Sequence, residues 1–134
     1  MNATSNSPQA NCSLHLHGFY DNSAFTYFYS VKSAVGMMIG TGNLGQELTS
    51  NTNDVNTYLS TDGGVSWSEA AKQSHIAEVG NYGGIILLGQ DIGYVDTVRF
   101  STNDGAAWKE CKFTQVPMDI VNVRVSPQAE SKKF

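Results

Sequence analysis

Two histidines, His15 and His17, are separated by one residue in a segment that alternates apolar and polar side chains. This alternation predicts a β-strand, in which residues two apart project from the same face. Paired imidazoles on one face can bind zinc, but a zinc site needs at least three protein ligands. The third histidine, His75, lies far along the chain. We therefore predict no metal site, although imidazoles that share a face would be sensitive to endosomal acidity.

Residues 40–45, Gly-Thr-Gly-Asn-Leu-Gly, match the G-x-G-x-x-G pattern of dinucleotide sites and follow an apolar stretch. Asp62 lies 22 residues after Gly40, close to the spacing at which such sites place an acidic ribose ligand. A dinucleotide site also requires a helix that begins at the glycines and directs its N-terminus at the pyrophosphate. Residues 46–53 are rich in Thr, Ser and Asn and do not predict that helix. We expect a glycine turn and no bound cofactor.

Acidic residues and arginines do not combine into a catalytic or calcium-binding set. Segments 53–54 and 103–105 resemble parts of a calcium loop, but the glutamate that closes such a loop is missing from both. Glycosidases that hold a sugar carboxylate need several arginines, and this chain has only Arg99 and Arg124. No serine, histidine and acid combine with a nucleophile elbow. The sequence therefore predicts that the protein is not an enzyme.

A short motif that occurs twice is the strongest signal in the sequence. Both copies fit the pattern Ser-x-(Asp/Asn)-x-Gly-x-x-Trp. The first copy is Ser60, Asp62, Gly64 and Trp67, and the second is Ser101, Asn103, Gly105 and Trp108. Each residue of the first copy lies 41 residues before its counterpart. Internal periods of about 40 to 50 residues are typical of repeat architectures, which include β-propellers.

The residue types of this motif favour a tight turn between two strands. The Asp62 carboxylate can accept hydrogen bonds from backbone N–H groups of its own turn, and Ser60 can add another. Two glycines follow and permit the positive φ that tight hairpin turns require. Trp67 then begins the outgoing strand and packs its ring against the sheet. Because Asn103 replaces the aspartate in the second copy, the motif does not need a charge, and we interpret it as structural.

This motif is the Asp-box, and its surroundings resemble the luminal ten-bladed β-propeller of the sortilin, or vacuolar protein sorting ten, receptor family. The resemblance covers residues 11–125. Its segments are Cys12-Ser13-Leu14-His15-Leu16-His17, Ala34-Val35-Gly36, Gly83-Gly84-Ile85-Ile86 and Val98-Arg99-Phe100-Ser101-Thr102-Asn103-Asp104-Gly105. The resemblance implies part of a type I membrane receptor of the Golgi, endosomes and cell surface. It implies peptide or protein cargo for the complete propeller and assigns no ligand-binding residue to this chain.

Composition and charge limit the other classes of function. Of 134 residues, 40% are hydrophobic and 15% are charged, which suits a β-rich domain with a modest solvated surface. The net charge is −4 with only eight Lys and Arg, so we predict no nucleic-acid partner. No apolar run of about 18 residues predicts a membrane span, and the polar N-terminus does not resemble a signal peptide. Under the resemblance, signal and anchor lie outside this chain.

The chain contains two cysteines, Cys12 and Cys111, and two N-glycosylation sequons, at Asn2 and Asn11. The cysteines would pair only if the ends of two blades meet, and nothing in the sequence brings them together. The resemblance implies a disulfide at Cys12 whose partner is unknown. We predict glycosylation at Asn2 and Asn11 only if the chain enters the secretory pathway.

Apolar periodicity predicts an all-β, antiparallel fold. The expected strands are residues 13–20, 34–42, 54–60, 67–71, 75–82, 84–90, 96–101, 108–113 and 120–125. Residues 34–42 are nearly continuously apolar, so we expect that strand to be buried on both faces, followed by a loop over 43–53. The expected organisation is a polar loop or insert tail at 1–11, four-stranded propeller blades at 12–73 and 74–115, and the truncated start of another blade at 116–134.

A blade buries its faces only against neighbouring blades, and fewer than about three repeats seldom form a stable structure. Two blades and one strand therefore predict a fragment of a larger wheel, or a chain that self-associates. The implied function is part of the luminal cargo-binding propeller of a sortilin-like sorting receptor. Two alternatives stay open, namely a fragment of a sialidase-like Asp-box glycosidase and a small secreted β module for protein contact.

Overall fold

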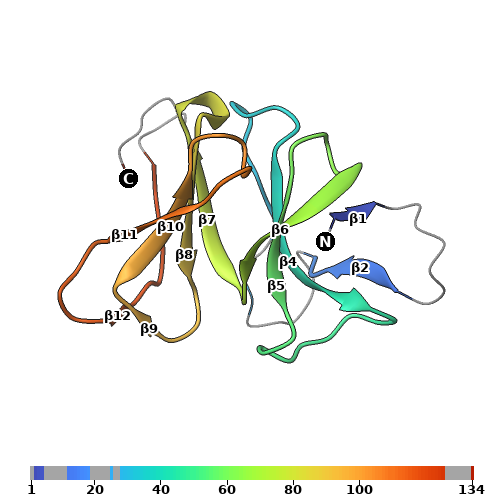
Figure 1. Ribbon diagram of the computed structural model, residues 1–134, viewed down its shortest axis with the longest axis horizontal. Coiled ribbons are helices and arrows are strands. Elements are labelled where there is room, and N and C mark those ends of the chain that lie inside the picture. The colour runs from blue at the N-terminus through green and yellow to red at the C-terminus, as the bar shows by residue number, and fades with distance from the viewer. Residues whose placement is uncertain (1, 5–11, 19–24, 26–27, 126–133) are drawn as a thin grey trace. The chain divides into compact units, whose positions relative to one another are not determined.

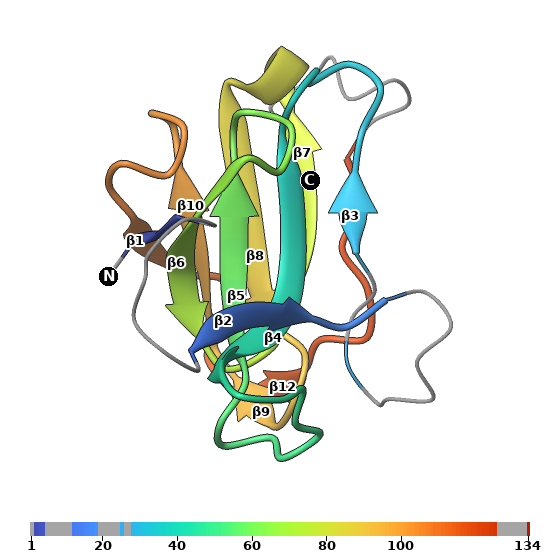
Figure 2. The ribbon, with the colours of Figure 1, turned by 90° about the vertical axis from the view of Figure 1, so that its right-hand side faces the viewer.

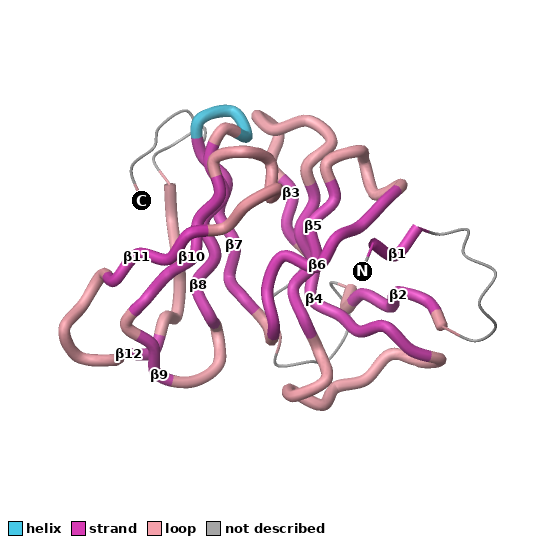
Figure 3. The backbone as a smooth tube through the Cα atoms, in the orientation of Figure 1, coloured by secondary structure: helices cyan, strands magenta, loops and turns pink. Residues whose placement is uncertain are grey.

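The computed structural model describes residues 2–4, 12–18, 25, 28–125 and 134 of the chain. Within these residues the regular structure consists of β-strands and one short 3-10 helix (Figure 3). The elements are β1 (Asn2–Thr4), β2 (Ser13–Leu16), β3 (Tyr29–Ser30), β4 (Met38–Gly45), β5 (Asn56–Ser60), β6 (Ser66–Lys72), β7 (His75–Gly80), η1 (Asn81–Gly83), β8 (Ile85–Gln90), β9 (Tyr94–Val95), β10 (Thr97–Ser101), β11 (Lys109–Lys112) and β12 (Met118–Asp119). The prediction of an all-β antiparallel fold is confirmed.

The chain divides into two compact units, and each contains one main sheet. In the first unit, residues 1–30 and 36–74, the strands β2, β4, β5 and β6 are neighbours in chain order and pair antiparallel. Figure 2 shows β4, β5 and β6 side by side. Two short strands extend this meander, because β1 (Figure 1) pairs with β6 and β3 (Figure 2) pairs with β4.

The second unit, residues 31–35 and 75–134, repeats the same order of strands. Its sheet runs β7, β8, β10 and β11, again antiparallel and in chain order. The single helical turn η1 connects β7 to β8, and the short strands β9 and β12 form a separate pair. The main part of each sheet is therefore a four-stranded meander, which is the arrangement expected of propeller blades.

Each sheet carries its own buried apolar side chains. In the first unit, Val55 and Tyr58 are buried completely or almost so, at 0% and 1% exposure. In the second unit, Val79, Ile86 and Leu88 are all at 0% exposure. Val79 lies opposite Ile86 in the register of β7 and β8. Residues opposite each other in a ladder share a face, so one face of the second sheet holds these side chains.

The strand predicted at residues 34–42 begins and ends later than expected. Gly36 has a φ of +83° and turns the chain, so that β4 starts only at Met38. Val35 precedes this turn and is 94% exposed. The prediction that residues 34–42 are buried on both faces is therefore wrong at Val35, although Ile39 is buried at 3% exposure.

The glycine-rich segment 40–45 belongs to β4, so the turn predicted there is wrong. Gly42 lies opposite Leu16 in the β2–β4 ladder, and a Cβ atom on Gly42 would overlap the carbonyl oxygen of His15. A Cβ atom on Gly40 would lie 3.4 Å from the Leu16 side chain. Glycine is used here because the strands approach closely, which is a recognised use of glycine within sheets.

The N-terminal segment predicted as a polar loop contains a strand. In β1, Asn2 lies opposite Ser68 and Thr4 lies opposite Ser66 of β6. An edge strand such as β6 presents unpaired N–H and C=O groups, and pairing with them requires backbone groups rather than apolar side chains. Residues 5–11 lie outside the described part of the chain.

The sequence predicts a strand at residues 120–125, and this prediction is wrong, because the structure contains no strand there. The segment instead lies over one face of the second sheet, because a Cβ atom on Gly89 would meet Ile120 at 3.1 Å and Val123 at 3.5 Å. Gly89 belongs to β8, an interior strand whose ladder hydrogen bonds go to β7 and β10. A segment above such a face finds no ladder partner, which explains why it is not a strand.

Gly42→Ala should destabilise the chain by at least about 2 kcal/mol, because the new methyl group would force β2 away from β4. Thermal unfolding measures this loss. Gly63→Ala is the matched control, because Gly63 has a φ of +74° but no atom within 4 Å of an added Cβ. Only the backbone cost of roughly 1 kcal/mol is expected there. Equal losses in the two variants would contradict the steric argument.

Candidate functional site

The first Asp-box connects β5 to β6 and is organised by the hydroxyl group of Ser60, which is 1% exposed. Ser60 Oγ donates a hydrogen bond to Asp62 Oδ1 (2.8 Å) and accepts from the N–H groups of Gly64 (2.9 Å) and Asp62 (3.4 Å). Asp62 Oδ1 accepts from the backbone N–H of Ser66 (2.9 Å), and Asp62 Oδ2 accepts from Ser66 Oγ (2.6 Å). The serine and the aspartate together satisfy three backbone N–H groups of the turn.

The second Asp-box, between β10 and β11, repeats these hydrogen bonds except the one from the Ser66 hydroxyl group. Ser101, also 1% exposed, donates to Asn103 Oδ1 (2.9 Å) and accepts from the N–H groups of Gly105 (3.0 Å) and Asn103 (3.4 Å). Asn103 Oδ1 accepts from the N–H of Ala107 (2.9 Å). Both copies of the motif therefore form the same turn, one in each unit.

The two turns differ in charge. Hydrogen bonds from the side chain and then the backbone of Ser66, together with the one from Ser60, lower the pKa of Asp62 from 3.8 to about 2. The second turn has Asn103 at this place and Ala107 in place of the hydroxyl donor. A carboxyl group with so low a pKa is ionised near neutral pH and does not suit a general acid. The arrangement supports a turn rather than catalysis.

The two motif tryptophans are half-buried. Trp67 Nε1 donates a hydrogen bond to the carbonyl oxygen of Gly64 (3.0 Å), and its ring meets Phe28 edge-on at a centroid distance of 6.0 Å. The Arg99 guanidinium lies 5.9 Å from the centroid of the Trp108 ring. Each tryptophan thus contacts its own unit, through an aromatic pair in the first and a cation–π contact in the second.

The first turn is also tied to the chain that precedes β4. The N–H of Gly63 donates to the carbonyl oxygen of Gly36 (2.9 Å). Gly36 has a φ of +83°, and a Cβ atom there would lie 3.3 Å from the carbonyl oxygen of Thr61. Sequence reasoning did not assign this role to Gly36. The available signal was a glycine directly before an apolar run, which marks a turn at the entry to a strand.

The imidazoles of His15 and His17 contact two different backbone carbonyls. His15 Nε2 lies 3.2 Å from the oxygen of Gly45, and His17 Nε2 lies 2.8 Å from the oxygen of Thr49. His17 is 3% exposed, and its ring centroid is 4.8 Å from that of Phe25. These contacts hold the end of β4 and the loop after it against β2. In the described part of the chain, no three His, Cys, Asp or Glu side chains are grouped to hold a metal ion.

The other predicted site residues lie apart from the two turns. Cys12 and Cys111 are both exposed free thiols. Asn2 lies in β1, and Asn11 is outside the described residues. Over the residues that the structure describes, no helix has the length and apolar character needed to cross a membrane. Glycosylation and a Cys12 disulfide stay predictions.

The chain is similar to known sorting proteins over nearly its whole length. A family model named Sortilin-Vps10, described as "Sortilin, neurotensin receptor 3", matches residues 1–123. The vacuolar protein sorting/targeting protein 10 of Aspergillus terreus (strain NIH 2624 / FGSC A1156) is 37% identical over 123 residues, which are 92% of this chain and 8% of that protein. The protein of the same name from Lodderomyces elongisporus is 37% identical over 128 residues, 96% of this chain and 9% of the relative. The chain therefore spans less than a tenth of these relatives.

Asp62→Asn should be tolerated, because the amide oxygen of Asn103 makes the same contacts as Asp62 Oδ1. Asp62→Ala should lower the melting temperature by several degrees, because it leaves the N–H of Ser66 without its acceptor. Asn103→Asp and Asn103→Ala form the matched pair in the second turn. There too the alanine variant should lose more melting temperature than the variant that keeps an acceptor oxygen. If Asp62→Asn proves as harmful as Asp62→Ala in thermal unfolding, the first turn needs the charge and the interpretation is wrong.

The stability of the chain should depend on Asp62 only under strongly acidic conditions. The pKa of Asp62 is lowered from 3.8 in the unfolded chain to about 2 in the fold. The contribution of the ionised carboxylate to the free energy of unfolding is therefore complete above pH 3.8 and is lost as the pH falls through about 2. Melting temperatures of the parent chain and of Asp62→Asn, measured from pH 7 to pH 2, test this. Their difference should be constant down to about pH 4 and then change in favour of the variant. A difference that does not vary with pH would contradict the lowered pKa.

Proposed function

The chain belongs to the Sortilin-Vps10 family, and from this membership we propose that it forms part of the luminal, ligand-binding propeller of a sorting receptor. In this proposal the complete propeller binds peptide or protein cargo and carries it between the Golgi and endosomes. The observation that carries the proposal is the family match over residues 1–123. The relatives are named for vacuolar protein sorting and targeting, and this chain covers 8% to 9% of their length.

The proposed organisation is a blade at residues 12–73, a second at 74–115 and the start of a third at 116–134. The two meanders and their matching turns support the first two blades. One face of the second sheet supports the third blade. On this face Leu87 and Phe100 lie opposite each other and are only half-buried. On the same face, Ile120 and Val123 approach Gly89. Repeat proteins cover such faces with the next repeat, and an isolated fragment would self-associate there.

The cellular placement follows from the same proposal. The chain lies in the lumen of the secretory pathway, and a signal and a membrane anchor are supplied by parts of the receptor outside it. Asn2 and Asn11 are then accessible to glycosylation, and Cys12 has an oxidising environment in which to pair with a cysteine outside this chain. We assign no catalytic residue, metal or nucleic-acid partner to the chain.

Cells that lack the full-length receptor should secrete soluble proteins that are otherwise delivered to the vacuole or lysosome, measured by immunoblotting of the medium. Re-expression of the receptor should restore their retention. Re-expression with Ser60→Ala and Ser101→Ala together should not, because both turns lose the hydroxyl that organises them. Asp62→Asn is the matched control and should restore retention, since it keeps the turn.

Unchanged retention in cells without the receptor would contradict a sorting role. Hydrolysis of a fluorogenic sialoside by the purified receptor would favour the glycosidase alternative instead. Restored retention with the double serine variant would leave the sorting role intact and would show that the turns are not needed for it.

A further inference from the structure

The connection between the two sheets is short and contains a backbone conformation that non-glycine residues disfavour. β6 ends at Lys72 and β7 begins at His75, so only Gln73 and Ser74 connect them. Gln73 has a φ of +64°. In this left-handed region the Cβ atom crowds the carbonyl oxygen that follows, which is why glycine is usual there. A glutamine at this position requires neighbouring groups that hold the backbone in place.

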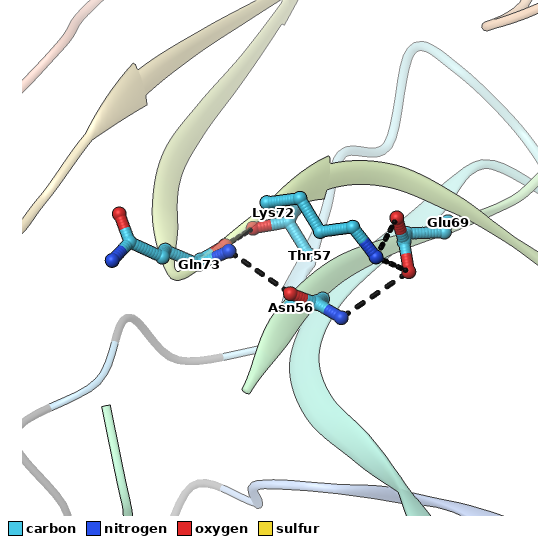
Figure 4. A network of polar contacts seen from close by, with 5 residues as sticks. All are labelled: Asn56, Thr57, Glu69, Lys72 and Gln73. Carbon is cyan, nitrogen blue, oxygen red and sulfur yellow. Dashed lines mark hydrogen bonds and ion pairs between the residues drawn. The ribbon is translucent and has the colours of Figure 1, made fainter. Parts of the chain in front are cut away.

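Both backbone groups of Gln73 are held by two consecutive residues of β5. Asn56 Oδ1 accepts a hydrogen bond from the N–H of Gln73 (3.1 Å), and Thr57 Oγ1 donates one to its carbonyl oxygen (2.8 Å). Figure 4 shows the side chains of Asn56 and Thr57 both directed at the Gln73 backbone. Thr57 is completely buried, so its hydroxyl group is shielded from competing water.

Asn56 is itself held by further side chains. Its Nδ2 donates to Glu69 Oε2 (3.2 Å), and Lys72 Nζ binds both oxygens of the same carboxylate at 2.9 Å and 2.8 Å (Figure 4). Burial raises the pKa of Tyr58, and a hydrogen bond with the Asn56 side chain opposes this shift only in part. The amide group of Asn56 is therefore fixed, with its oxygen directed at the connection.

The second repeat lacks this arrangement. The residues 41 positions after Asn56, Thr57 and Gln73 are Thr97, Val98 and Thr114. Val98 has no hydroxyl donor. The hydroxyl group of Thr114 instead makes two hydrogen bonds with the backbone of Val116, which form a local turn. The chain after β11 also takes a longer path before its next strand. The contacts around Gln73 are thus specific to the tight connection between β6 and β7 and are not a general feature of the repeat.

We propose that a network of four side chains holds Gln73 in the left-handed conformation. Its members are Asn56, Thr57, Glu69 and Lys72. Asn56 and Thr57 act on the backbone directly, and Glu69 and Lys72 position Asn56. The network replaces the glycine that the connection would otherwise need. This inference does not depend on the receptor function.

Limited proteolysis of the full chain tests the proposal, because trypsin can cleave after Lys72 only when the connection opens. Rates of cleavage at Lys72 are normalised to the same bond in the denatured chain. Asn56→Ala should increase the rate at least roughly tenfold through loss of the hydrogen bond to Gln73. Adding Gln73→Gly should lower it again by roughly tenfold, because glycine adopts the left-handed conformation without the network.

Gln73→Ala is the matched control, because alanine removes the glutamine side chain but keeps the Cβ atom. Combined with Asn56→Ala, it should leave the fast cleavage unchanged. If Gln73→Gly fails to slow cleavage, or if Gln73→Ala slows it equally, the network does not act through the backbone conformation and the proposal is wrong. Should Asn56→Ala not fold, Thr57→Val in the same backgrounds gives the comparison at the other end of the residue, because it removes the hydroxyl group that donates to the Gln73 carbonyl oxygen.

Discussion

Both sheets depend on how a hydroxyl group is satisfied where a strand ends inside the protein. Ser60 and Ser101 are each 1% exposed, and a buried hydroxyl group without partners costs roughly 1 to 3 kcal/mol. The hydrogen bonds between paired strands join backbone groups only, so they give the serine hydroxyl groups no partner. The chain satisfies them by turning back at once, so that a side-chain oxygen two residues on and an N–H group four residues on both reach the hydroxyl group. The hairpin geometry follows from this requirement.

The same requirement explains which features the two repeats share and which they do not. The turn needs an acceptor oxygen rather than a charge, so Asp62 and Asn103 are equivalent in it. The glycine whose N–H bonds the serine has a positive φ in both copies, +90° for Gly64 and +80° for Gly105. Outside the turn no such hydrogen-bond requirement applies, and the two units differ there in their additional strands. The first sheet gains β1 and β3, whereas the second unit contains a separate β9–β12 pair.

The parts of the structure that were predictable from sequence are those governed by local chemistry. The strand meanders follow from apolar periodicity, and the turn follows from serine, aspartate and glycine spacing. The errors occur where the reason for a residue lies elsewhere in the chain. Gly42 was assigned to a turn, but it is required by the backbone of His15, which belongs to another strand. Gln73 carries no sequence signal for its positive φ, because the groups that hold it lie on β5, 16 and 17 residues earlier.

The charge of the first turn also limits how the protein can respond to acid. The proposed role takes the chain through compartments that become more acidic toward endosomes, at about pH 5 to 6. Asp62, with a pKa of about 2, stays ionised throughout this range, and Asn103 does not ionise. The two turns therefore keep their hydrogen bonds throughout this pH range. If the complete propeller of the proposed receptor releases cargo on acidification, the groups that titrate therefore lie outside the two turns.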